Sequence, residues 1–163
     1  MHEELGAFGF NQDSSCISIG TSNGFRVFLS DPLECMFERN GLQDIKIAEL
    51  LFRNQIVALV GGPENRIYQN NKVTIWDDYQ LRKIDEIIVG QPVLAVKLRK
   101  DKIVVVMRKK VHMYNLGDLE FFGALQTVDN PTGICALNST SETFVMAVLS
   151  ESSAETVFIQ VLN

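Results

Sequence analysis

Residues 10–28 read Phe-Asn-Gln-Asp-Ser-Ser-Cys-Ile-Ser-Ile-Gly-Thr-Ser-Asn-Gly-Phe-Arg-Val-Phe. Two short runs rich in Ile, Val and Phe flank a turn of small polar residues and glycine, which is the pattern of two strands joined by a tight turn. Gly20 and Gly24 bound that turn, where the backbone needs positive φ or close packing. The stretch therefore predicts an antiparallel hairpin with strands at residues 16–20 and 25–29.

The same hairpin pattern recurs along the chain. Phe28, Trp76 and Tyr114 occupy corresponding positions 48 and 38 residues apart, and propeller blades repeat at about 40–45 residues. The loop at residues 61–71 accounts for the longer interval, and Trp76-Asp77 ends its strand as in WD-type blades. Residues 44–51 also fit a helical pattern, although they alternate well enough for a strand. Further strands are predicted at residues 45–51, 56–60, 72–76, 93–98, 102–107, 110–115, 144–149 and 157–161.

The repeat predicts an all-β fold, a β-propeller of four-stranded antiparallel blades of which about three and a half are present. The approximate blades cover residues 5–40, 41–88, 89–128 and 129–163. We expect residues 1–163 to be the N-terminal part of a single propeller domain and a fragment of a longer protein, because the array has no polar capping repeat.

Composition excludes several classes of protein. The 46% hydrophobic and 21% charged residues are typical of a globular chain. No apolar run approaches the roughly 18 residues that a membrane-spanning helix needs, and the acidic start predicts no signal peptide and a cytoplasmic protein. Residues 45–114 carry a net charge of +6, whereas the flanking segments are acidic and the whole chain is −5. This balance argues against a nucleic-acid partner.

Catalytic and metal-binding patterns are missing from the sequence. It contains no Gly-x-Ser-x-Gly elbow, P-loop or Rossmann fingerprint. Cys16, Cys35 and Cys135 are widely spaced, and the two histidines add no cluster with zinc-ligand spacing. We therefore expect no enzyme activity, no metal site and no cofactor.

Five blocks of the chain, in this order and spacing, resemble the PROPPIN or WIPI-type family of phosphoinositide-binding β-propellers of autophagy and endosomal traffic. They are the opening stretch, Leu50-Leu51-Phe52-Arg53-Asn54-Gln55-Ile56-Val57-Ala58-Leu59-Val60-Gly61-Gly62, Asn71-Lys72-Val73-Thr74-Ile75-Trp76-Asp77-Asp78, Val96-Lys97-Leu98-Arg99-Lys100-Asp101-Lys102-Ile103-Val104-Val105-Val106, and Asn130-Pro131-Thr132-Gly133-Ile134-Cys135-Ala136-Leu137. The resemblance implies a full protein with seven blades, of which this chain is the N-terminal half.

The resemblance also implies a lipid ligand. Members of the family bind phosphatidylinositol 3-phosphate and phosphatidylinositol 3,5-bisphosphate through a Phe/Leu-Arg-Arg-Gly motif in a later blade, and no such tetrapeptide occurs here. We therefore assign no lipid-binding residue to this chain. The densest basic run, Arg108-Lys109-Lys110, reads as a solvated hairpin turn.

The loop at residues 62–70 is the first candidate for partner binding. In the family this loop contains a proline next to a basic residue, and it helps to dock the lipid-transfer protein that feeds membrane to the growing autophagosome. The sequence departs from the family pattern, since Pro63 is displaced from Arg66 and Gln69-Asn70 replaces a proline pair. Arg66 beside Ile67 or Tyr68 still predicts a cation next to an apolar anchor, a common hot-spot pairing. An ordinary solvent loop is the alternative.

Lys97, Arg99 and Lys100 are the second candidate. Alternation along a strand predicts that Lys97 and Arg99 share one face, and in the family the cleft between blades two and three receives acidic partner segments. The alternative is a charged strand edge that resists aggregation.

The sequence thus predicts an autophagy or endosomal adaptor that recruits autophagy proteins to phosphoinositide membranes, with the lipid motif outside this chain. Its expected location is the cytoplasm, peripherally on autophagosomal precursor, endosomal or vacuolar/lysosomal membranes. The alternative is a WD-type interaction scaffold without lipid binding.

Overall fold

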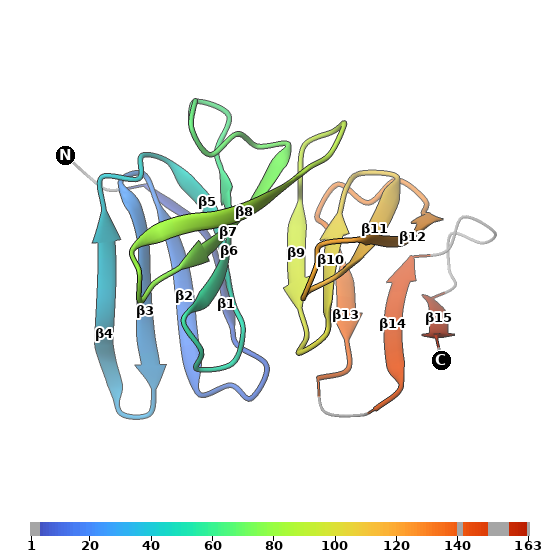
Figure 1. Ribbon diagram of the computed structural model, residues 1–163, viewed down its shortest axis with the longest axis horizontal. Helices are drawn as coiled ribbons and strands as arrows, with labels where there is room; N and C mark the ends of the chain where they lie inside the picture. Colours follow the sequence, from blue (N-terminus) through green and yellow to red (C-terminus); the bar gives the residue numbers. More distant parts are fainter. Residues whose placement is uncertain (1–3, 140–141, 150–156, 163) are drawn as a thin grey trace. The chain divides into compact units, whose positions relative to one another are not determined.

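The computed structural model describes residues 4–139, 142–149 and 157–162 (Figure 1). Every regular element in these residues is a β-strand, and all pairings are antiparallel between strands adjacent in sequence. No helix in this part of the chain is long and apolar enough to cross a bilayer. The all-β prediction is confirmed, and the segment at residues 44–51 contains a strand, Ile45–Leu50, rather than a helix.

The strands form three four-stranded sheets and one three-stranded sheet within the described residues. The first sheet contains β1 (Leu5–Phe10), β2 (Cys16–Thr21), β3 (Gly24–Ser30) and β4 (Leu33–Asn40). The second contains β5 (Ile45–Leu50), β6 (Ile56–Gly61), β7 (Lys72–Asp77) and β8 (Arg82–Ile88). The third contains β9 (Ala95–Leu98), β10 (Lys102–Val106), β11 (Lys110–Asn115) and β12 (Phe121–Gln126), and the fourth β13 (Cys135–Leu137), β14 (Phe144–Leu149) and β15 (Val157–Leu162).

All ten predicted strands are present, with ends shifted by at most two residues, and five further strands appear: β1, β4, β8, β12 and β13. All five are edge strands of their sheets, and most of the side chains of β4, β8 and β12 are exposed. An exposed strand carries no apolar alternation for the sequence to reveal.

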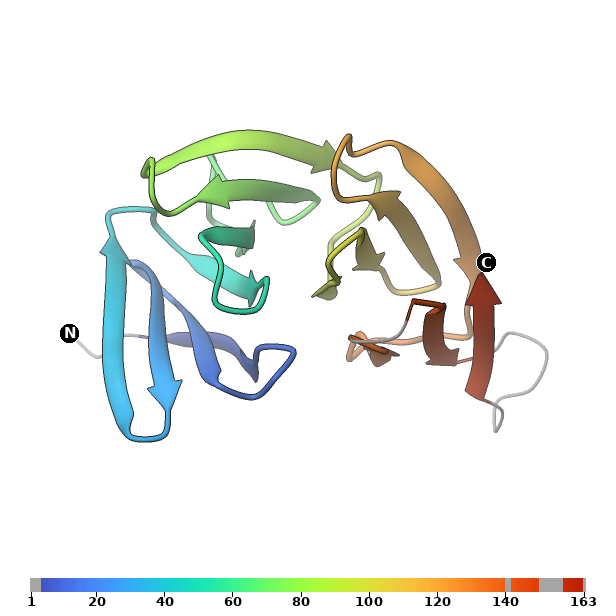
Figure 2. The same cartoon turned by 60° about the horizontal axis from the view of Figure 1, so that its bottom comes forward.

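Two compact units divide the chain, residues 1–90 and 91–163. That all four sheets belong to one domain stays a prediction. In the first unit the blue-to-cyan first sheet packs against the second (Figure 2). Their shared core is made of Cys16, Phe25, Val27, Ile45, Ala48, Leu50, Val57, Leu59, Tyr68 and Trp76.

Polar contacts also join these two sheets. The buried Ser18 hydroxyl donates to the carbonyl of Ala48. Arg39 forms a bidentate pair with Asp78 (2.7 and 2.8 Å), and the Trp76 indole N–H donates to the same carboxylate (3.2 Å). Gly24 has φ +150°, and a Cβ there would overlap the carbonyl oxygen of Arg39. The opening hairpin therefore needs glycine at this position because β4 lies against it.

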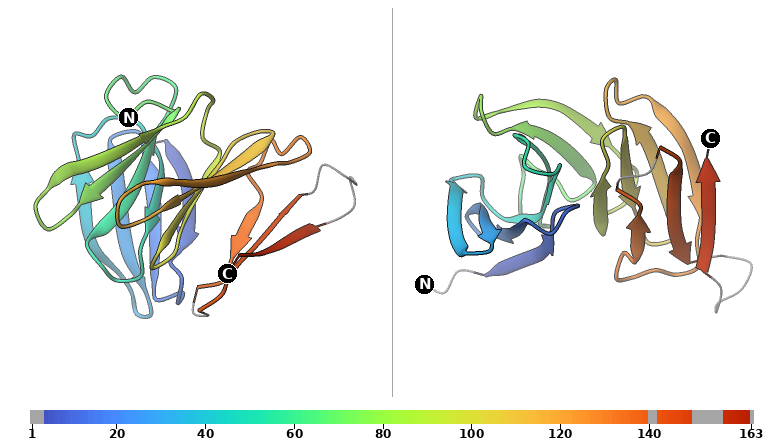
Figure 3. Two further views of the ribbon diagram at one scale, coloured as in Figure 1. Left: turned by 45° about the vertical axis from the view of Figure 1, so that its right-hand side comes forward. Right: turned by 90° about the horizontal axis from the view of Figure 1, so that it is seen from below.

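In the second unit the yellow-to-orange third sheet lies beside the orange-to-red fourth sheet (Figure 3). Strands β10 and β11 bring Val104, Val106, Val111 and Met113 against Phe144, Met146 and Val148 of β14. Alternate residues of β14 are buried, as expected for a strand with one covered face.

Candidate functional site

The loop between β6 and β7 is held in one conformation by Asn65, whose side chain is 4% exposed. Its amide nitrogen donates to the carbonyls of Leu42 (3.0 Å) and Asp44 (2.9 Å). Its amide oxygen accepts from the backbone N–H groups of Ile67 (3.0 Å) and Tyr68 (2.9 Å). All four bonding positions of the amide are thereby used, which fixes the loop to the segment before β5.

Tyr68 anchors the far side of the same loop. It is 8% exposed and packs in the core of the first unit with Trp76. Burial raises the pKa of the Tyr68 phenol, against a smaller opposing effect of the Lys83 charge. The carbonyl of Tyr68 lies where a Cβ on Gly61 would be, so glycine is required as β6 ends. The Tyr68 ring is covered by this chain's own core, and its predicted role in partner binding stays a prediction.

Arg66 and Ile67 form the exposed tip of the loop, which we call the Arg66–Ile67 tip. Ile67 is 62% exposed, and Pro63 and Arg66 are also exposed. No described residue hydrogen-bonds or pairs with the Arg66 guanidinium. The loop thus presents a cation beside an aliphatic side chain, on a backbone held in place by Asn65 and Tyr68.

Arg99, from the second predicted group, is a buried structural residue. It is 1% exposed and donates to Asp101 (2.6 Å), to the amide oxygen of Asn138 (3.1 Å), and to the carbonyls of Thr143 (2.8 Å) and Glu142 (3.1 Å). These bonds fasten the end of β9 to the segment that leads into β14. The guanidinium is engaged inside the second unit by these four bonds, and the predicted role of Arg99 in partner binding stays a prediction.

Lys97 and Lys100 do not form one surface with Arg99. Lys97 is half-buried on β9 opposite Val104, whereas Lys100 is exposed in the following turn and pairs with Glu142 (3.2 Å). Asp101 completes the turn. Burial raises the pKa of its carboxyl, but the hydrogen bond and charge of Arg99, with the charge of Lys102, bring the pKa below its usual value.

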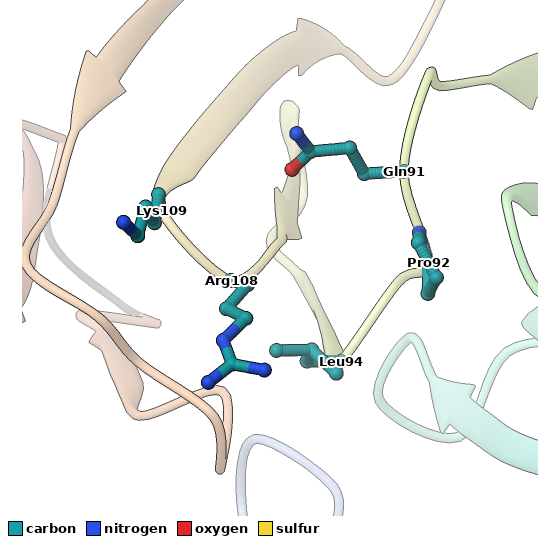
Figure 4. A pocket seen from close by; sticks show the side chains of 5 residues that line it. All are labelled: Gln91, Pro92, Leu94, Arg108 and Lys109. Carbon is teal, nitrogen blue, oxygen red and sulfur yellow. The ribbon is translucent and has the colours of Figure 1, made fainter.

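A hollow in the second unit was not predicted from the sequence. It measures about 330 Å³ and is lined by Gln91, Pro92, Leu94, Arg108 and Lys109 (Figure 4). The basic run at residues 108–110 was the only signal in the sequence that could have found it. The partners of that run, residues 91–94, precede β9 and carry no recognisable motif.

Comparison with known proteins gives one consistent result. A model of the PROPPIN family matches residues 4–161. Autophagy-related protein 18 of Komagataella pastoris is 30% identical over 149 residues, which are 90% of this chain and 27% of that protein. Hsv2 of Kluyveromyces marxianus superposes with a TM-score of 0.84 at 21% identity, covering 99% of this chain and 49% of that chain.

A further solved structure, KlAtg21 in complex with the coiled-coil of AgAtg16, gives a TM-score of 0.75 at 20% identity and covers 97% of this chain and 52% of that chain. The structural likeness identifies the fold as part of a β-propeller. This chain spans about half the length of these solved propellers and 27% to 41% of the curated relatives that it matches.

Proposed function

The chain belongs to the PROPPIN family of non-enzymatic autophagy β-propellers, and from this premise we propose that it docks autophagy partner proteins through the Arg66–Ile67 tip. The full adaptor would recognise phosphatidylinositol 3-phosphate and phosphatidylinositol 3,5-bisphosphate through residues outside this sequence. Its membranes would be autophagosomal precursors, endosomes, and vacuoles or lysosomes.

Protein partners are supported by the relatives. Several curated relatives are autophagy-related proteins, and one solved neighbour was determined with a coiled-coil bound. For this chain we propose a lipid-transfer protein of autophagy as the partner of the tip. Lys97 and Lys100 remain candidates for a second contact.

The observation that carries the proposal is the rigid presentation of the tip. Asn65 and Tyr68 fix the backbone on either side of Arg66 and Ile67, so little conformational entropy is lost when a partner binds. An arginine beside an aliphatic anchor supplies both a charged hydrogen-bond donor and apolar area, and arginine is among the residue types enriched in interface hot spots. Loops held on a rigid scaffold are the usual place for such contacts.

The lipid part of the proposal depends on avidity. Exposed charges are screened over roughly 8 Å at physiological salt, so one headgroup contact holds a protein weakly. A second site or an inserted loop multiplies the residence time on a membrane. The sequence has no Phe/Leu-Arg-Arg-Gly motif, and we expect this chain alone not to float with liposomes that contain phosphatidylinositol 3-phosphate.

The affinity of the chain for the lipid-transfer protein tests whether the Arg66–Ile67 tip is the docking site. Arg66→Glu should weaken capture about tenfold or more, because it reverses the charge at the anchor. Arg82→Glu, a change at another exposed arginine on β8 of the same unit, is the charge-matched control and should bind as the wild type does. Asn65→Ala keeps Arg66 but releases the loop, and should also weaken capture. Equal affinity of Arg66→Glu and wild type would refute the assignment.

Flotation separates the lipid proposal from the scaffold alternative. A longer family member that carries the tetrapeptide is the positive control. Flotation of this chain alone would place a lipid site among its own residues. If a protein containing this chain and its continuation failed to float, the WD-type scaffold without lipid binding would replace the proposal.

A further inference from the structure

The hollow beside β9 is lined in part by apolar side chains. Pro92 and Leu94 line one side, and the turn between β10 and β11 lines the other with Arg108 and Lys109 (Figure 4). Its volume of about 330 Å³ is in the range of small ligand sites and exceeds that of one large aliphatic side chain. Apolar surface of this kind gains free energy when a ligand removes it from water.

The backbone around the hollow is fixed by hydrogen bonds. The carbonyls of Arg108 and Lys109 accept from the N–H groups of Asn130 (2.7 Å) and Thr127 (2.9 Å). On the other side, the N–H of Leu94 donates to the carbonyl of Val106 (2.8 Å). The hollow is therefore largely formed before any ligand arrives, which lowers the entropy lost on binding.

The two cations at the rim differ in their availability. The Arg108 guanidinium already holds Asp129 in a bidentate pair (2.6 and 2.9 Å), and that hydrogen bond lowers the pKa of the Asp129 carboxyl. Lys109 is exposed, and no described residue forms a contact ion pair with its ammonium, although its charge also helps to lower the pKa of Asp129. With Arg108 paired to Asp129, the rim keeps an excess of one positive charge, which lies on the flexible Lys109 side chain.

Gln91 adds a polar group of another kind. Its side chain extends over the hollow from the segment before β9, as Figure 4 shows. A side-chain amide both donates and accepts hydrogen bonds, as a peptide backbone does. The apolar side chains of the hollow suit a hydrophobic amino-acid side chain. The Lys109 ammonium suits a carboxylate, and the Gln91 amide suits a main-chain peptide group.

We propose that this hollow binds a short linear segment of a partner protein, with a bulky aliphatic side chain against Pro92 and Leu94 and an adjacent acidic residue paired with Lys109. A phosphorylated headgroup fits less well, because phosphate recognition uses several converging donors and Arg108 is engaged by Asp129. The proposal is independent of the Arg66–Ile67 tip.

Fluorescence anisotropy with a labelled peptide tests the site. The probe is fluorescein-Gly-Ser-Asp-Leu-Glu-Gly-Ser, and two matched probes replace both acids with Lys or the Leu with Ser. We expect the full chain to bind the first probe and to bind each matched probe about tenfold more weakly, because each lacks one of the two anchors.

Substitutions in the chain test whether the peptide binds in this hollow. Lys109→Glu should weaken the acidic probe about tenfold and strengthen the lysine probe, because the rim charge is reversed. Leu94→Ser should weaken the acidic probe about fivefold by removing part of the apolar lining. Lys46→Glu, at an exposed site on β5, makes the same change in net charge and should leave binding unchanged. Arg66→Glu should also leave it unchanged.

Three results would overturn the proposal. One is no binding of the acidic probe by a chain that is folded by circular dichroism. Another is equal binding by wild type and Lys109→Glu. The third is binding to vesicles that carry phosphatidylinositol 3-phosphate, lost in Lys109→Glu, without binding of the peptide, since the hollow would then be a lipid site.

Discussion

Replacing Arg99 with methionine removes a charged group that fastens the third sheet to the fourth. The guanidinium makes four hydrogen bonds, to Asp101, Asn138, Glu142 and Thr143, and lies 5.7 Å from the centre of the Phe144 ring. Methionine keeps most of the aliphatic volume of the arginine stem. The substitution therefore tests the hydrogen bonds rather than the packing.

The expected loss is about 3 kcal/mol. Removing one partner of a buried ion pair costs about 3–5 kcal/mol, because the remaining polar groups are left without their bonds. The lower end applies here for two reasons. The Asp101 side chain is 41% exposed and regains water, and the Thr143 carbonyl keeps a second hydrogen bond from the Asn138 amide.

Hydrogen exchange of the β14 amides measures this loss where it occurs. At 1.4 kcal/mol for each tenfold, a loss of about 3 kcal/mol accelerates exchange through local opening about a hundredfold. Trp76 is the only tryptophan and lies in the core of the first unit. Its fluorescence reports whether that unit stays folded, which separates a local effect from global unfolding.

The neighbouring residue supplies the control. Lys100→Met removes an ion pair with Glu142 in which both side chains are at least half exposed, and such pairs contribute about 0–1 kcal/mol. Exchange of β14 should change by less than about fivefold in this variant. If Arg99→Met also changed the exchange rate of β14 by less than about fivefold, the buried hydrogen bonds of Arg99 would not be what holds the two sheets together. That result would refute the reasoning.

Two further predictions concern the first unit and pH. Arg39→Met should lower the stability of the first unit by about 1 kcal/mol, because a partly exposed bidentate pair with Asp78 is lost. Urea unfolding followed by Trp76 fluorescence measures this, and unchanged midpoints would contradict it. Burial lowers the pKa of His112, with a smaller effect of Lys110. Stability should therefore be fully present above the ordinary pKa of about 6.5 and fall as pH drops through the lower folded value. The measurement is the urea midpoint, followed by circular dichroism, at pH 7 and at pH 5. The midpoint should differ less between the two pH values in His112→Gln than in wild type, and an equal difference in the two proteins would count against this.

The inner hairpins could be predicted from the sequence because their chemistry is local. Strands such as β6 and β10 are runs dominated by Val, Ile and Leu between turn residues, and almost all of their residues are buried. The edge strand β4 has no such run, since glutamates and an arginine interrupt its apolar residues and most of its side chains are exposed. Its position in the sheet is set by pairing with β3, and such pairing leaves no hydrophobic pattern in the sequence.

The candidate site divides in the same way. Arg66 and Ile67 were predicted as an exposed cation and anchor, and the structure places both at the surface. Arg99 has the same residue type and a similarly basic neighbourhood, yet it is buried. The difference lies in Asn138 and the carbonyls of Glu142 and Thr143, about forty residues further along the chain. Charge in a sequence indicates a functional surface only when nothing distant in the chain uses it.

Three asparagine side chains hold the segments that carry or contact the buried and the exposed arginines. Asn65, Asn130 and Asn138 each donate to a main-chain carbonyl and accept from a main-chain N–H, so each side chain acts as an additional peptide group. Asn65 fixes the tip that carries Arg66, Asn138 binds Arg99 itself, and Asn130 donates its own N–H to the carbonyl of Arg108. Replacing any of the three should release a loop rather than a strand. The proposed binding surfaces of this chain therefore depend on asparagine residues that hold the backbone beneath them.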